Sequence, residues 1–179
     1  NLDIAEVHSQ GLEVLMHEAY DQLYGKDADL MRLASLKDLL YAVLSGCSED
    51  KFQQWVYENP DATLDELNAV HAELDTQFGM YEMYYEWVEI PHHFESPFYY
   101  ISYATSAISA LEIWETAQQD RDHALEIYDQ ITQFTNNAQY REPLEQCGLS
   151  DPFDSNCVEE IAEVLADYAD IDLEQLQAA

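Results

Sequence analysis

The sequence contains few residues that interrupt regular structure, and it has no long apolar run. Its 179 residues include only five glycines and five prolines, whereas 47% are hydrophobic. This balance is typical of a folded chain and excludes extensive disorder. No apolar run approaches the roughly 20 residues that a membrane-spanning helix needs, so we do not expect a membrane protein.

Positive charge is also scarce. Six lysine and arginine residues stand against 37 acidic residues, which gives a formal net charge of −31. Nucleic acids and anionic membranes are polyanions that require a basic surface, so neither is expected as a partner. The acidic residues are spread along the whole chain, which is typical of a solvated surface; attraction of cationic peptides is the alternative interpretation.

Cysteine is rare, and its spacing does not match a metal site. The three cysteines, Cys47, Cys147 and Cys157, form no C-x-x-C pair. An odd number of cysteines without a recognisable secretory signal favours reduced thiols, and we therefore predict a cytoplasmic protein. We expect all three cysteines to be structural, and a bridge between Cys147 and Cys157 is not indicated.

The hydrophobic pattern predicts an all-α protein. Apolar residues recur every three or four positions through most of the chain, and we expect one helical domain over residues 1–179, built as a multi-helix bundle. A capping box, Thr63 with Glu66, begins one helix, and Gly25 and Gly148 stand where helices would end. The expected helices cover residues 3–24, 28–44, 50–59, 64–78, 98–118, 121–135, 140–147 and 156–169, with Ser48 as the N-cap of the third.

The first candidate site lies on the opening helix. Glu6, Glu13 and His17 are seven and then four positions apart, which places them on one helical face. A carboxylate and an imidazole aligned in this way suit zinc, but two ligands on one helix do not complete a site. On spacing alone, the alternative is an exposed Glu–His pair.

The second candidate is the stretch "PHHFESPFYYISYATS". His92 and His93 precede a helix whose first turns carry Tyr99, Tyr100 and Tyr103. An imidazole and phenolic hydroxyls that converge on one point suit the stabilisation of a developing oxyanion. Tyrosines at helical spacing also occur as core residues with a hydroxyl at the edge, and this is the alternative.

Three segments, in order, resemble the thimet oligopeptidase and oligoendopeptidase F family of zinc peptidases. They are "DIAEVHSQGLEVL", "DKFQQWVYENPDATLDELNAVHAEL" and "HHFESPFYYISYATSAISALEIW", and "GLSDPFDS" is similar to a turn near the end of the family's chains. The resemblance extends from Leu2 to about Leu165. It implies that this chain is the C-terminal part of a zinc endopeptidase that hydrolyses short peptides.

The resemblance implies a metal-binding role for the first candidate. The family motif E-x-x-S-x-x-x-E is matched by "EVHSQGLE", so Glu6 corresponds to the third zinc ligand. Glu13 corresponds to the second acidic position, which would orient a zinc-bound histidine.

The resemblance also implies catalytic roles for the second candidate. The family places a histidine and tyrosines here that stabilise the tetrahedral intermediate and the substrate carbonyl. Tyr103 matches one of these tyrosines, and either His92 or His93 matches the histidine. Tyr100 and Tyr99 match less closely.

The family's two zinc histidines and its general-base glutamate, in an H-E-x-x-H motif, would precede the first residue of this chain. We therefore expect the chain to be inactive and without zinc on its own, and to need an upstream region that carries H-E-x-x-H. An isolated fragment would expose apolar surface, so self-association is expected. The rival hypothesis is a non-catalytic helical module that binds a peptide or a protein without hydrolysis.

Overall fold

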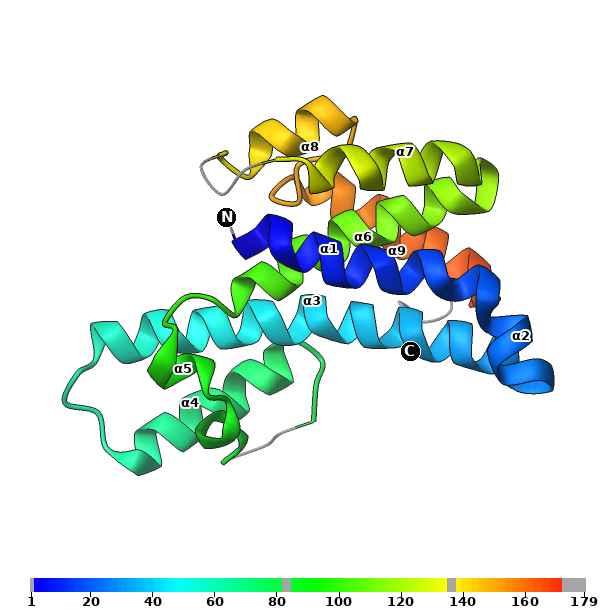
Figure 1. Ribbon diagram of the computed structural model, residues 1–179. Helices are drawn as coiled ribbons and strands as arrows, with labels where there is room; N and C mark the ends of the chain where they lie inside the picture. The colour runs from blue at the N-terminus through cyan, green and yellow to red at the C-terminus, as the bar shows by residue number, and fades with distance from the viewer. Residues whose placement is uncertain (1, 82–84, 135–137, 172–179) are drawn as a thin grey trace. The chain divides into compact units, whose positions relative to one another are not determined.

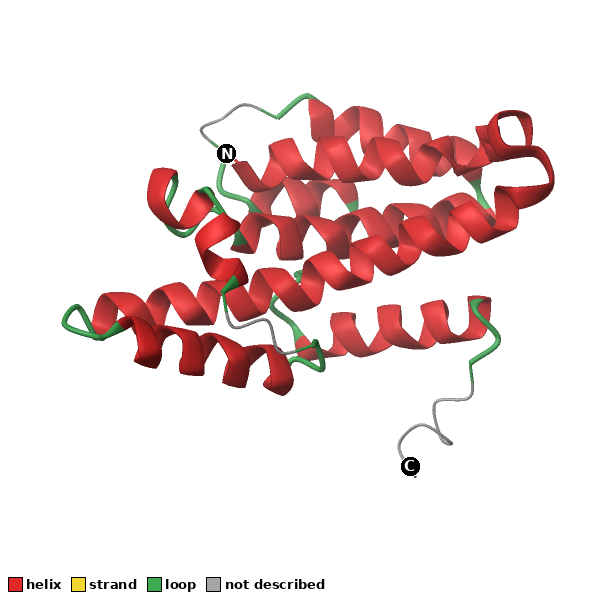
Figure 2. Ribbon diagram, turned by 90° about the horizontal axis from the view of Figure 1, so that it is seen from below, coloured by secondary structure: helices red, strands yellow, loops and turns green. Residues whose placement is uncertain are grey.

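The structure is a computed structural model that describes residues 2–81, 85–134 and 138–171. Every regular element within these ranges is helical, as Figure 2 shows, so the predicted all-α class is confirmed. None of the helices in the described ranges combines the length and the apolar character that a membrane span requires.

The helices are grouped into two compact units. One consists of Asn1–Leu39 with Thr105–Ala179, and the other of Leu40–Ala104; below they are called the first and the second unit. The α-helices are α1 (Leu2–Leu15), α2 (Tyr20–Tyr24), α3 (Ala28–Glu58), α4 (Leu64–Gln77), α5 (His92–Glu95), α6 (Ile101–Gln119), α7 (Arg121–Thr132), α8 (Arg141–Cys147) and α9 (Ser155–Tyr168). The 3-10 helices in the described ranges are η1 (Met16–Ala19), η2 (Gly25–Asp27) and η3 (Glu86–Glu89).

The first unit is built around close helix packing. α1 packs against α7, and Gly11 of α1 permits their approach, because a Cβ atom there would lie 3.2 Å from the Tyr128 ring. The Tyr128 hydroxyl donates a hydrogen bond to the His8 carbonyl at 3.0 Å, which fixes the register of the two helices. The buried apolar side chains of this unit include Val7, Val14, Leu36, Leu111, Ile113, Trp114, Ile131 and Leu144.

The second unit is organised by the parts of α3 and α4 that lie side by side in Figure 1. Its buried core contains Phe52, Leu74 and Trp87, and the Trp87 indole donates to Asn68 Oδ1 at 2.9 Å. Burial of this apolar surface holds η3 beside the two long helices, because Trp87 belongs to η3.

The capping box and the two predicted glycine helix ends are confirmed. Thr63 and Glu66 form the predicted capping box, with the Thr63 amide donating to the Glu66 carboxylate at 2.8 Å. Gly25 and Gly148 adopt positive φ values of 56° and 73° at the ends of α2 and α8.

Two predicted helix boundaries are wrong. A break was expected at "SGCSED" with Ser48 as N-cap, but α3 continues through it and Ser48 is fully buried. Gly46 lies inside α3. A Cβ atom at this position would come within 2.7 Å of the Ala104 Cβ atom, so the position requires glycine. The glycine therefore serves a close helix contact rather than a chain break. The opening helix, expected over residues 3–24, is interrupted by η1, which carries the buried His17.

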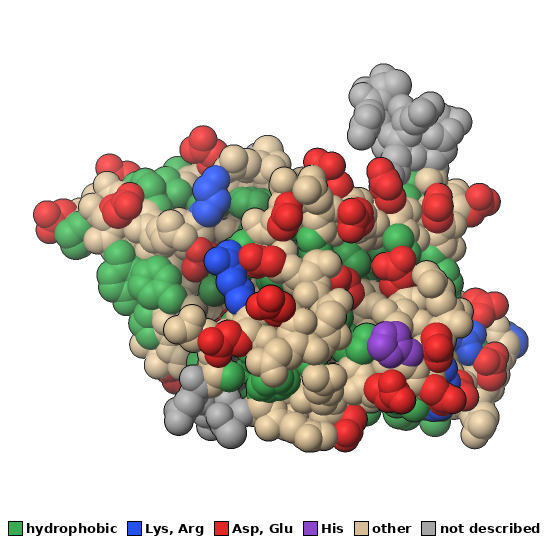
Figure 3. Space-filling view, turned by 90° about the horizontal axis from the view of Figure 1, so that it is seen from above, with side chains coloured by type: hydrophobic (Ala, Val, Ile, Leu, Met, Phe, Trp, Pro, Cys, Tyr) green, Lys and Arg blue, Asp and Glu red, His purple; other side chains and the backbone are tan. Residues whose placement is uncertain are grey.

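The surface is acidic and the cysteines are reduced, as the sequence predicted. In Figure 3, aspartate and glutamate side chains are distributed over the visible face, and lysine and arginine side chains are few. Cys47, Cys147 and Cys157 are free thiols, so no bridge joins Cys147 to Cys157.

Candidate functional site

Glu6 lies on α1, in the first unit, with a half-buried side chain. Its Oε2 atom accepts a hydrogen bond from the Ser9 hydroxyl at 3.0 Å, one helical turn away. Within the described ranges, a single group of three potential metal ligands gathers closely, and Glu6 does not belong to it. Taken alone, the described residues therefore do not form a zinc site around Glu6.

Glu13 is linked to His17 through a serine. The Ser35 hydroxyl donates to Glu13 Oε1 at 2.8 Å, and His17 Nε2 lies 3.0 Å from the same hydroxyl. Because the single proton of the hydroxyl goes to Glu13, His17 must donate through Nε2. His17 is only 5% exposed. Glu13 and His17 therefore do not form the exposed Glu–His pair that was the alternative on spacing alone.

Burial determines the charge of His17. Desolvation, with a smaller contribution from the nearby Arg32 charge, lowers the pKa of His17 to about 4. The ring is therefore neutral near pH 7, and the chain from His17 through Ser35 holds the Glu13 carboxylate in one orientation.

In the second unit, His92 faces the tyrosines. Its Nε2 atom lies 3.3 Å from the Tyr103 hydroxyl oxygen. Its ring stacks on Tyr99, with ring centroids 5.1 Å apart and an interplanar angle of 6°, and meets Tyr100 edge-on at 5.6 Å. These four side chains, from α5, the turn before α6 and the first turn of α6, are called the tyrosine cluster below. Burial, followed by the Glu49 charge, raises the pKa of Tyr100, so this phenol keeps its proton.

His93 points to a different partner. Its Nε2 atom lies 2.9 Å from Glu49 Oε2 on α3, and its side chain is 5% exposed. The two adjacent histidines thus have separate environments: His92 lies with Tyr103, and His93 lies with a buried carboxylate. The sequence left open which histidine accompanies Tyr103, and in the structure it is His92.

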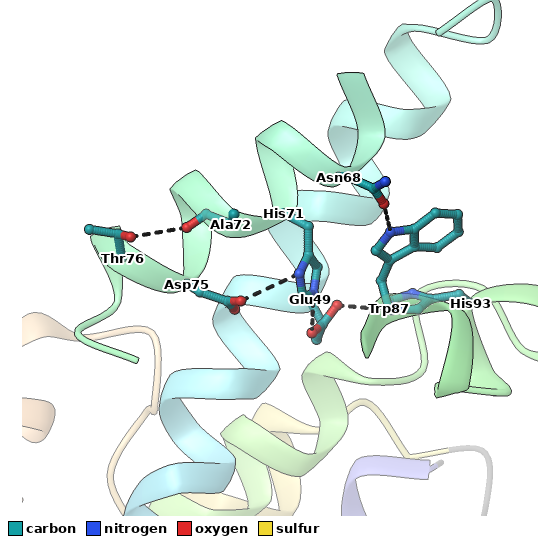
Figure 4. Close-up of polar contacts among 8 residues, drawn as sticks. All are labelled: Glu49, Asn68, His71, Ala72, Asp75, Thr76, Trp87 and His93. Carbon is teal, nitrogen blue, oxygen red and sulfur yellow. Dashed lines mark hydrogen bonds and ion pairs between the residues drawn. The ribbon is translucent and has the colours of Figure 1, made fainter. Parts of the chain in front are cut away.

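Glu49 connects His93 to a second histidine, as Figure 4 shows. Its Oε1 atom lies 3.0 Å from His71 Nε2, and His71 Nδ1 lies 3.4 Å from Asp75 Oδ2. Burial alone would raise the pKa of Glu49, but hydrogen bonds and charge interactions with His71 and His93 outweigh it and lower the pKa. The carboxylate is therefore ionised inside the protein.

Sequence reasoning missed this buried group. Glu49 and His71 are 22 positions apart, and nothing in their spacing indicates that they meet. The available signal was the i,i+4 spacing of His71 and Asp75 on one face of α4. A cavity of about 250 Å³ adjoins the group and is lined by Tyr41, Ser45, Glu49, His71, Asp75, Met80, Glu86, Glu89, Ile90 and Tyr100.

The fold is similar to those of solved oligopeptidase structures. A crystal structure described as an oligoendopeptidase F matches with a TM-score of 0.85 and 27% identity, over 94% of this chain and 32% of that chain. One described as an oligoendopeptidase F from Bacillus anthracis matches with a TM-score of 0.77 and 30% identity, over 95% of this chain and 29% of that one. The family resemblance seen in the sequence is confirmed.

A further similar structure is PZ peptidase A with an inhibitor, at a TM-score of 0.86 and 23% identity, over 96% of this chain and 32% of that chain. At this identity the likeness concerns the fold alone. The chain thus spans about a third of the length of these three solved chains. No protein-family model matches the chain, and neither does any of the curated proteins.

Proposed function

We propose that this chain is the C-terminal portion of an oligoendopeptidase F-like zinc endopeptidase that hydrolyses short peptides. The observation that carries the proposal is the fold match over 94% of the chain, together with the pairing of His92 and Tyr103. Because the chain spans about a third of those structures, the proposal includes an upstream region that completes the active site.

In this proposal the tyrosine cluster forms one wall of the substrate cleft. His92 Nε2, 3.3 Å from the Tyr103 oxygen, would orient the hydroxyl, and Tyr103 would donate its proton to a substrate oxygen that becomes negatively charged. Tyr99 and Tyr100 hold the His92 ring by stacking and edge contacts at 5.1 and 5.6 Å. Tyr100 remains protonated, so it adds no negative charge near the developing oxyanion.

Glu6 would be one zinc ligand, and two histidines of an upstream H-E-x-x-H motif would supply the others. Since the described residues hold no complete zinc site around Glu6, this chain alone is expected to bind no catalytic zinc and to be inactive. Glu13, held by Ser35, would accept a hydrogen bond from one of the zinc histidines and orient it.

The coding sequence upstream provides the first test. An H-E-x-x-H motif roughly 25 residues before Glu6 supports the enzyme. If the motif is absent, the proposal fails and a non-catalytic helical module becomes the better description.

Zinc content of the longer protein provides the second test. We expect Glu6→Ala to lose the bound zinc, and Glu13→Gln to weaken zinc binding by roughly 10–100-fold, as losses of orienting partners do. Glu159→Gln, an exposed change on α9, is the matched control and should retain zinc. Full zinc occupancy in Glu6→Ala, measured by elemental analysis after dialysis, would contradict the ligand assignment.

A further inference from the structure

Glu49 carries an imidazole on each of its carboxylate oxygens. His71 Nε2 lies 3.0 Å from Oε1, and His93 Nε2 lies 2.9 Å from Oε2 (Figure 4). The lowered pKa of Glu49 keeps it ionised, and an ionised carboxylate accepts hydrogen bonds without donating any. Both imidazoles must therefore present a proton at Nε2.

His71 is flanked by carboxylates on both sides. Besides Glu49 at Nε2, it has Asp75 Oδ2 at 3.4 Å from Nδ1. Glu49, His71 and Asp75 are 5%, 2% and 3% exposed, and buried carboxylates require a compensating positive charge. A neutral imidazole has one N–H and cannot donate to both sides, whereas an imidazolium ring can.

A proton suits this geometry better than a metal ion does. The carboxylates face opposite nitrogens of one ring, and a metal ion bonds to only one of them. Glu49, His71 and Asp75 each offer one ligand atom within 4.8 Å of the others, so a metal ion is the alternative carrier of the positive charge. It would replace the proton at the nitrogen that it binds and so remove one of the two hydrogen bonds of the ring. We therefore assign the positive charge to a doubly protonated His71.

The contact with Glu49 restrains His93 and the short helix α5. The Nδ1 atom of His93 is buried without a hydrogen-bond partner among the described residues, so the polar contact of its ring is the one at Nε2. The ring also packs edge-on against Phe52, with centroids 5.7 Å apart. Since α5 comprises only His92–Glu95 and has no side-chain N-cap bond, the contact of His93 with Glu49 is a principal restraint on its orientation.

We infer that Asp75, His71 and Glu49 are positioning residues that hold His93 protonated at Nε2 and thereby keep its neighbour His92 beside Tyr103. The hydrogen-bond chain is a property of this chain itself, while its catalytic consequence rests on the proposed function. Burying a charged network lowers the folding stability relative to an apolar cluster of the same shape. When every polar group in the network has a hydrogen-bond partner, however, the network fixes one arrangement of its side chains.

Nitrogen-15 NMR of the histidine rings in the full chain at pH 7 tests the inference. We expect both ring nitrogens of His71 to be protonated and His93 to be protonated at Nε2. In Glu49→Gln the amide has only one acceptor atom, so at least one of the two rings should lose its Nε2 proton. The proximity signals between His92 and Tyr103 should weaken in the same variant.

Asp75→Asn provides a second variant in case Glu49→Gln fails to fold. It should return His71 to the neutral form at pH 7 while His93 stays protonated at Nε2. Glu58→Gln, an exposed change on the same helix as Glu49, is the control and should leave all ring signals unchanged. A neutral His71 in the wild type, or unchanged rings in a folded Glu49→Gln, would overturn the inference.

Kinetics of the longer enzyme separate this inference from the proposed function. Glu49→Gln and Asp75→Asn should lower kcat by roughly 10-fold, the lower end of the usual effect of lost orienting partners, with KM little changed. An active wild type with full kcat in both variants would overturn the positioning role alone. An inactive wild type with the expected NMR signals would overturn the peptidase proposal and leave the hydrogen-bond chain standing.

Discussion

At the scale of single residues, the histidines differ by their neighbours rather than by their type. His17 lies beside a serine, His92 beside phenols, and His71 and His93 beside a buried carboxylate. Each environment sets a different proton arrangement, and each therefore gives a different experimental signature.

The buried His17 should make stability depend on pH. The pKa of His17 is about 4 in the folded chain, against an ordinary value of 6.5. Between these two pH values, the unfolded chain binds a proton at His17 that the folded chain does not bind. The stability contributed by neutral His17 is fully present above pH 6.5 and is lost progressively as the pH falls toward 4. Urea unfolding at pH 7 and pH 5 should show a smaller difference in His17→Gln than in the wild type.

The exposed His123 offers the matched control for this measurement. Because its side chain is 58% exposed, His123→Gln should keep the wild-type pH dependence. If His17→Gln also keeps it, His17 is not the group responsible.

Removal of the Tyr103 hydroxyl should slow the chemical step of the proposed longer enzyme. Tyr103→Phe is expected to reduce kcat by about 100-fold or more, the usual cost of one lost oxyanion donor, with a smaller effect on KM. Tyr57→Phe, which removes an exposed hydroxyl from the same unit, should stay near the wild-type kcat. Equal rates for the two variants, measured with one peptide, would rule out a donor role for Tyr103.

The sequence predicted the members of the tyrosine cluster, but it did not predict which histidine pairs with Tyr103. His92 and His93 are consecutive, and consecutive helical side chains project about 100° apart. Which of them meets Tyr103 depends on where Glu49 lies, and Glu49 is 44 positions away from His93. Such contacts come from tertiary packing, which spacing along the chain does not encode.

At the scale of helices, periodicity predicted most of the elements, and glycine caused the main error. Gly25 and Gly148 end helices through positive φ values, as predicted. Gly46 is also a glycine, but it lies inside α3. Glycine is required there because Ala104 leaves no room for a side chain. The sequence alone does not distinguish a glycine that ends a helix from one that allows a neighbouring helix to pack closely.

Gly46→Ala tests the steric requirement. The added methyl would lie 2.7 Å from the Ala104 Cβ atom, so a backbone shift is required. Overpacking typically costs about 1–3 kcal/mol, and the gain in helix propensity of about 1 kcal/mol offsets part of it. We expect a net loss of stability of up to about 2 kcal/mol by urea unfolding.

Glu58→Ala is the control on the same helix, and it should change the stability by less than about 0.5 kcal/mol because the side chain is exposed. A Gly46→Ala protein more stable than the wild type would show that the α3 backbone adapts freely at this position.

At the scale of the whole molecule, the chain carries large apolar side chains in the solvent. Leu12, Leu23 and Leu30 are 51%, 61% and 66% exposed in the first unit. We expect these surfaces to be covered in a longer protein and to drive self-association when the chain is alone. Light scattering after gel filtration should give a mass above 20.7 kDa that rises with concentration. A constant monomer mass at high concentration would contradict this expectation.

Peptide cleavage by the longer protein tests the central claim most directly. The assay compares a peptide of about ten residues with and without a zinc chelator, using the longer protein and the 179-residue chain side by side. We expect internal cleavage by the longer protein, its loss with chelator, its return with added zinc, and no cleavage by the chain alone. A longer protein that stays inactive with zinc bound would contradict the assignment of this chain to a zinc endopeptidase.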